Sequence, residues 1–421
     1  MTHPKLTAMV MGLCTLSPAF ASSQTESNGF VEDSHLDVLL RNAFIQRDKK
    51  HNVEDQSEWG QGATATFRSG FTQGTVGVGV DAFGTYGLRL DGGRGRSGGG
   101  GIDFFKQGDS GAAANDLARA GAAVKFRLSN TVLAHGDLMP ELPVLNTDKS
   151  RLLPESFTGT FITSNEIEGL ELHAGRFNAQ ARKSAEGRDS GRLKSIEVVG
   201  GRYQFSEALS ASVYATDVED VLKRQYVGVN YALALAESRS LTFDFNGYNT
   251  QQDKAFDGRG DDNLIWSLAA TYAQGPHAFT LAHQRSSGDT GYNYGWYQNA
   301  GGVGDGGSSI YLANSYWSDF NAKDENSWQV AYGYDFAEVG VPGLRYHVAY
   351  VRGDNIDTGG NGRGKERELF NQLQYTVQSG AAKDLNVRLR SSIVRVSNNA
   401  RDYNDDGNEV RVFIDYPINV F

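Results

Sequence analysis

Three arginines near the C-terminus could bind an anion together. Arg388 and Arg390 alternate with apolar residues in LNVRLRSSIVRV (385–396), and Arg411 alternates with valines in the next segment of this kind. Side chains two residues apart lie on the same face of a β-strand, so Arg388 and Arg390 point in the same direction. Guanidinium groups bind carboxylates through charge-assisted, often bidentate hydrogen bonds. The spacing therefore indicates a row of fixed positive charges, able to attract anions, on one face of a sheet.

The same alternation of apolar with small or polar residues recurs along most of the chain. It runs for about ten residues at a time between Gly, Asn and Asp turns, which is typical of antiparallel strands. Clear examples are 76–90, 226–235, 328–336, 344–351 and 410–420. Counting such segments predicts roughly 16 to 18 strands, each about as long as a transmembrane barrel strand.

Composition narrows the class of protein. The 421-residue chain has a formal net charge of −10, which argues against nucleic-acid binding by the whole protein. Beyond the N-terminus, no stretch reaches the roughly 18 apolar residues that a membrane-spanning helix needs. There are only 8 prolines and no linker-like segment, so residues 22–421 are predicted to form a single domain.

The first 21 residues are typical of an export signal. MTHPK is weakly basic, LTAMVMGLCTL is a short apolar core, and SPAFA ends in small residues that suit cleavage after Ala21. Cleavage there would remove Cys14, the only cysteine of the chain. The exported protein would then have neither disulfides nor thiol chemistry.

Many alternating strands fit either a soluble sandwich or a transmembrane barrel. Three features favour the barrel: the export signal, the aromatic residues near the ends of the apolar faces, and the glycine and alanine on the polar faces. A closed barrel also pairs every backbone ladder group, as a bilayer demands. The prediction is an all-β antiparallel barrel in a Gram-negative outer membrane, surrounded by lipid and lipopolysaccharide.

In such a barrel the arginine row lines the lumen. Lys125 and Arg127 in AGAAVKFRLSN also share one face and are predicted to join it. Fixed cations in a narrow passage attract anions, and several moderate sites allow a solute to enter and to leave. The alternative is that these residues brace the wall through ion pairs with Asp and Glu, as in a general-diffusion porin.

Four segments resemble the OprD family of pseudomonad outer-membrane channels. They are LPVLNTDKSRLLPESFTGTFITSNEIEGLELHAGRF (142–177), GFVEDSHLDVLLRNAFIQRD (29–48), SGFTQGTVGVGVDAFG (69–84) and SIYLANSYWSDFN (309–321). The resemblance implies an 18-stranded monomeric barrel with a loop folded inward. It also implies a ladder of basic residues leading to this constriction, and uptake of small molecules that carry a carboxylate.

The resemblance also assigns residues to the site. The inward constriction loop corresponds to about 137–156, with Arg151 near the constriction, and the ladder corresponds to Arg388, Arg390 and Arg411. A second long loop, about 286–325, would supply the opposite side with Asp305, Ser308 and Ser309. Ser308 stands where many relatives have an aspartate, which favours a substrate without an amino group.

The sequence thus predicts a channel for passive diffusion of carboxylates, with benzoate-like aromatic or cyclic acids favoured. No cofactor, metal or catalytic residue is expected, and the protein would be a monomer or a weak trimer. Alternatives are an OprD-like channel for basic amino acids or peptides, and a general-diffusion porin. A hydrolase within a barrel rests only on Ser391 and Ser392 beside the arginines, so no enzymatic activity is expected.

Overall fold

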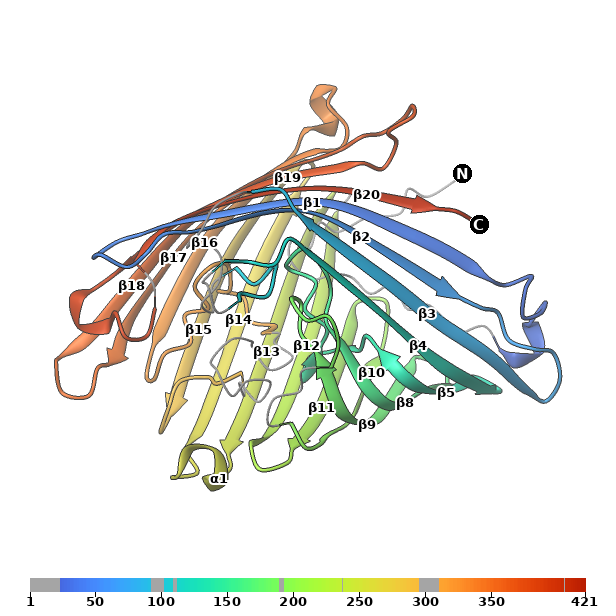
Figure 1. Ribbon diagram of the computed structural model, residues 1–421. Helices are drawn as coiled ribbons and strands as arrows, with labels where there is room; N and C mark the ends of the chain where they lie inside the picture. Colours follow the sequence, from blue (N-terminus) through green and yellow to red (C-terminus); the bar gives the residue numbers. More distant parts are fainter. Residues whose placement is uncertain are drawn as a thin grey trace.

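The computed structural model describes residues 23–91, 102–108, 112–188, 193–236, 238–294, 310–404 and 406–421. Within them, eighteen strands pair side by side in one antiparallel sheet (Figure 1). The sheet closes on itself because β1 (His35–Lys49) pairs with both β2 (Gln56–Arg68) and β20 (Gly407–Asn419). The predicted 18-stranded β-barrel is confirmed.

The other barrel strands follow one another around the wall. They are β3 (Val76–Arg89), β4 (Asp116–Leu128), β5 (Thr131–Leu138), β8 (Ser156–Ile167), β9 (Leu170–Ala181), β10 (Ile196–Gln204), β11 (Leu209–Val218), β12 (Leu222–Ala236), β13 (Arg239–Gln252), β14 (Asp262–Gln274), β15 (His277–Gly288), β16 (Asn326–Asp335), β17 (Leu344–Asp357), β18 (Arg363–Thr376) and β19 (Asn386–Val396). The remaining short elements are not part of the barrel wall. They are the hairpin of β6 (Glu141–Leu142) and β7 (Leu145–Asn146) and the helices η1 (Gln24–Glu26), α1 (Lys254–Asp257), η2 (Phe336–Val339) and η3 (Asn398–Ala400). None of the described helices is long and apolar enough to cross a membrane.

Alternation along each strand separates a lipid face from a lumenal face. On β19, Leu389 is 45% and Ile393 is 42% exposed on the outside, whereas Arg388 and Arg390 are half-buried on the inside. On β3, Val76, Val78, Val80, Tyr86 and Leu88 are likewise exposed. An exposed apolar band of this kind is stable only against hydrocarbon, so the arginine-bearing face encloses the lumen.

The two ends of the barrel differ. At one end the connections are short turns, such as 129–130 between β4 and β5 and 275–276 between β14 and β15. The chain ends there, since Leu36 N at the start of β1 donates to Phe421 O at 3.1 Å. At the other end several connections are long, and two of them matter for the lumen. They are the constriction loop, 139–155, and the long loop, 289–325.

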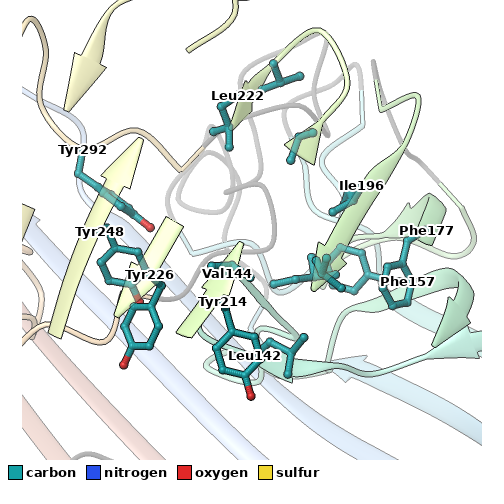
Figure 2. Close-up of a cluster of buried hydrophobic side chains, with 14 of the residues drawn as sticks. Leu142, Val144, Phe157, Phe177, Ile196, Tyr214, Leu222, Tyr226, Tyr248 and Tyr292 are labelled. Atoms are coloured by element: carbon teal, nitrogen blue, oxygen red, sulfur yellow. The ribbon is translucent and has the colours of Figure 1, made fainter. Parts of the chain in front are cut away.

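The apolar core of this protein lies inside the barrel. Leu142, Val144 and Leu145 of the constriction loop pack against inward side chains of β8 to β14 and against Leu312 of the long loop. Figure 2 shows several of these inward side chains: Phe157, Phe177, Ile196, Tyr214, Tyr226 and Tyr248. The constriction loop and the described parts of the long loop, 289–294 and 310–325, therefore pack against the wall and against each other.

Glycines on the inner wall make room for a second cluster. A Cβ added at Gly60 would lie 2.7 Å from Leu152 Cδ2 and 3.1 Å from the Phe105 ring, and one at Gly87 would lie 3.2 Å from Leu152 Cδ2. The constriction loop therefore rests directly on the backbone of β2 and β3. This contact explains why the inward faces of these strands are rich in glycine.

Candidate functional site

A cavity of about 2030 Å³ occupies the lumen beside the packed loops. Both loops line it, together with inward residues of many strands. Arg390 and Arg411 line it from β19 and β20, and Arg151 lines it from the constriction loop. Arg388 lies two residues nearer the short-turn end and is not among the lining residues.

Inward aromatic rings hold the arginines of β19. The Arg388 guanidinium lies 5.2 Å from the ring centre of Phe413, and that of Arg390 lies 4.9 Å from the ring centre of Phe370. Arg390 and Arg411 are register partners across β19 and β20. The guanidinium groups of Arg390 and Arg411, which both line the cavity, thus come from adjacent positions on the wall.

Glu409 neutralises part of this positive charge. Arg411 chelates its carboxylate through Nε and Nη2, and Arg47 of β1 donates to it from Nε at 2.7 Å. All three side chains are buried. Two arginines therefore share one carboxylate, and two of the five N–H donors of Arg411 are committed to the wall.

Arg390 is in a different state. It forms no ion pair with any residue that the structure describes, and its Nε has no acceptor among them. The charges of the neighbouring Arg388 and Arg411 add to the local positive potential, and Glu409 and Glu368 offset part of it. An anion in the cavity would meet donors that no described residue uses.

Arg151 helps to shape the constriction loop. Its Nε donates to Ile102 O at 2.7 Å and its Nη1 to Ser150 Oγ at 2.8 Å. Arg41 on the wall donates to Arg151 O at 2.8 Å and pairs with Asp415 at 2.7 Å. Arg151 thus lines the cavity, and the hydrogen bond from Arg41 ties the loop to the barrel.

A buried ion pair anchors the same loop. Lys183, in the connection after β9, lies 2.6 Å from Asp148, and both side chains are buried. Burial alone would raise the pKa of the Asp148 carboxyl, but the attraction of Lys183 and Arg151 holds it well below its usual value. The aspartate is thus ionised and depends on Lys183.

Replacing Lys183 by methionine should loosen the constriction loop. The change leaves a buried carboxylate without its lysine, which typically costs about 3–5 kcal/mol. We expect higher single-channel conductance and more open-channel noise in planar bilayers. Lys149→Met is the matched control, because Lys149 pairs with Glu141 on the same loop but is half-exposed and such pairs contribute about 0–1 kcal/mol. Equal traces from the two variants would contradict this anchoring role.

Lys125 and Arg127 lie near the short-turn end of β4. Lys125 Nζ lies 2.5 Å from Asp81, and Arg127 Nε donates to Gln24 Oε1 at 2.9 Å. Both cations lie over the ring of Phe71, at 4.9 and 4.2 Å. They face inward, but they are not among the residues that line the cavity.

The predicted residues of the long loop cannot be placed in the same way. Asp305, Ser308 and Ser309 lie outside the described residues, as does the export signal, 1–21. In the parts of the chain that the structure describes, no group of three or more His, Cys, Asp or Glu side chains is arranged to hold a metal ion.

Comparison with known proteins identifies the family. A family model described as outer membrane porin, OprD family, matches residues 28–420. The chain belongs to the OprD family.

Relatives of this OprD-family porin span nearly its whole length. Porin D of Pseudomonas aeruginosa is 42% identical over 429 residues, which cover 96% of this chain and 95% of Porin D. The crystal structure of Acinetobacter baumannii OccAB1 matches with a TM-score of 0.88 at 38% identity and covers 94% of this chain and 99% of that one. The crystal structure of P. aeruginosa OpdK with vanillate matches with a TM-score of 0.82 at 32% identity, and the match covers 93% of this chain and 100% of OpdK. The protein is therefore an outer-membrane channel, and the family consists of porins.

Sequence analysis of this OprD-family porin missed Glu409, Arg47 and Phe370. Glu409 lies two residues before Arg411, so strand alternation alone could have found their shared face. The signal at Arg47 is weaker, because its inward neighbours on β1, Ala43 and Ile45, are apolar. Its pairing with Glu409 also depends on which strands close the barrel.

Proposed function

We propose that small carboxylates diffuse passively through this channel along its arginines. Arg390 carries the proposal, because it lines the cavity and forms no ion pair with a described residue. A cation fixed in the wall of a narrow cavity attracts anions more strongly than the same charge in bulk water. A substrate carboxylate would accept the hydrogen bonds that Arg390 does not give to the protein.

The neighbouring groups suit passage rather than trapping. Arg47 and Arg411 share Glu409, so they add a weaker attraction beside Arg390, and Arg151 adds another from the constriction loop. A series of moderate sites lets an anion move from one to the next and leave. The driving force would be the concentration gradient of the solute alone.

Benzoate-like acids are the favoured substrates. Ser308 stands at the position that the family resemblance links to an aspartate, and a hydroxyl there offers no charge to a substrate ammonium group. The solved relative OpdK contains vanillate, which is itself an aromatic carboxylate. Both observations support an acid without an amino group.

A specific observation supports basic amino acids as the second candidate. Asp244 of β13 lines the cavity, and no described residue forms an ion pair with it. Its carboxylate accepts hydrogen bonds from Asn230 and Asn246. A substrate with both a carboxylate and an ammonium group could use Arg390 and Asp244 together.

Uptake into proteoliposomes separates these candidates. The full-length protein would be reconstituted and offered labelled benzoate, acetate, arginine and an uncharged sugar of similar size. We expect benzoate to enter fastest and to interrupt the ion current in planar bilayers, with anions more permeant than cations. Faster entry of arginine would support the second candidate, and equal entry of all four solutes would indicate a general-diffusion porin.

A further inference from the structure

We propose that Tyr316 is the residue with which this channel distinguishes aromatic from aliphatic carboxylates. The inference rests on the proposed carboxylate passage and adds to it a site for the ring of the substrate. Tyr316 belongs to the long loop, and its side chain lines the cavity.

Several contacts fix the Tyr316 ring in one position. Its hydroxyl donates to Gln329 Oε1 and lies 3.2 Å from His347 Nε2. The ring stacks on Phe370 of β18, with 4.3 Å between ring centres and 25° between ring planes. A ring that is already held in place loses little conformational entropy when a ligand packs against it.

The tyrosine ring and the Arg390 guanidinium contact the same phenylalanine. Phe370, which Tyr316 stacks on, also supports the guanidinium of Arg390 at 4.9 Å. Phe370 itself is only 3% exposed, so a solute meets Tyr316 and Arg390 rather than the phenylalanine. In benzoate the carboxylate is bonded directly to the ring, so a ring site has to adjoin the carboxylate site. The Tyr316 ring and the Arg390 guanidinium, held on the same phenylalanine, are the pair to which we assign these two sites.

Two other lumenal aromatic residues of the long loop lie beside guanidinium groups that are already engaged. Trp317 lies near Arg47, with 5.7 Å from the guanidinium to the ring centre, but Arg47 is paired with Glu409. Tyr292 lies 4.3 Å from Arg224, which donates to Thr250 Oγ1 and to a loop carbonyl. Of these three rings, that of Tyr316 shares a support with a guanidinium that has no ion-pair partner among the described residues.

The test compares two acids on two variants. Currents through the full-length protein are recorded in planar bilayers while benzoate or acetate is added, and the concentration for half-block is measured. Tyr316→Leu should raise this concentration for benzoate about five-fold, the effect of losing one aromatic contact, and leave that for acetate unchanged. Tyr316→Phe keeps the ring and should retain most of the benzoate block. Tyr311→Leu, which removes another lumenal tyrosine of the same loop, is the control and should leave the ratio of the two acids unchanged.

The outcomes distinguish a failure of the ring site at Tyr316 from a failure of the proposed carboxylate passage. If Tyr316→Leu weakens the block by both acids equally, Tyr316 only anchors the loop and the inference is wrong. It is also wrong if benzoate block is unchanged in Tyr316→Leu. If no carboxylate blocks the wild-type channel, the proposed function itself fails, and the ring site fails with it.

Discussion

Arg390→Gln should raise the benzoate concentration needed for half-block by about ten-fold or more, since a hydrogen bond to a charged group contributes about 1.5–3 kcal/mol. Glutamine keeps a polar side chain on the wall but loses the positive charge and the bidentate geometry. The ring of Phe370 remains to support the shorter side chain. Single-channel recordings with benzoate on the long-loop side measure the change directly.

Arg411→Gln is the matched comparison for this variant. It removes the same charge from the register partner of Arg390. The Arg411 donors already serve Glu409, however, so little direct binding to a solute is lost. We expect both variants to lower anion selectivity, measured as reversal potential in a salt gradient, but only Arg390→Gln to weaken benzoate block strongly. Equal block in Arg390→Gln and wild type would contradict a carboxylate site at Arg390.

Alkaline pH should loosen the long loop through Glu325. This side chain is fully buried next to β16, and its carboxyl is hydrogen-bonded to that of Glu366 on β18. Burial, and then repulsion by Glu366 and Asp354, raise the pKa of Glu325 well above its usual value. A hydrogen bond between two carboxyl groups requires a proton, so the protonated form holds the loop.

The sign of the effect follows from this raised pKa. Anchoring by Glu325 is complete below the ordinary carboxyl pKa and is lost as the pH rises through the raised value. Between the ordinary and the raised pKa, each rise of one pH unit lowers the free energy with which Glu325 stabilises the loop by about 1.4 kcal/mol. Deprotonation of Glu325 places a further negative charge beside Glu366 and Asp354. Glu368 lies on β18, the same strand as Glu366. We expect open-channel noise to increase from acidic to alkaline pH in the wild type.

Glu325→Gln should remove this pH dependence. The glutamine amide can donate to Glu366 as the protonated acid does, but it cannot lose a proton. Open-channel noise of the Glu325→Gln variant should therefore stay constant across the same pH range. Asp324→Asn is a suitable control, because the neighbouring Asp324 forms a partly exposed pair with Arg363 at 3.1 Å. If Glu325→Gln and the wild type respond alike, Glu325 does not hold the loop.

The alternation in the sequence was enough to predict the wall and its lumenal face. Leu389 and Ile393 are exposed to the outside and Arg388 and Arg390 are not, because a strand permits only two side-chain directions. Partners could not be predicted in this way. Whether Arg390 or Arg411 is neutralised depends on Glu409 and on Arg47, which meet only when the first and last strands of the barrel pair.

The loop residues were beyond the reach of periodicity for a different reason. Tyr316 and Glu325 lie in a segment without regular alternation, so nothing in their spacing shows which way they point. Their positions follow from tertiary contacts with Phe370 and Glu366, on a strand about 50 residues later in the chain. Family resemblance located the loop, but the contacts had to come from the structure.

The apolar cluster between the two loops helps to set the width of this channel. In a plain tube, the circumference of the wall fixes the width, and widening it takes additional strands. Here Leu142, Val144 and Leu145 fill part of the cross-section by packing. A truncation such as Leu145→Ala should therefore widen the channel as well as lower its stability. Evolution can retune which solutes fit by adjusting methyl groups in this filling, while the hydrogen-bonded cylinder around it stays the same.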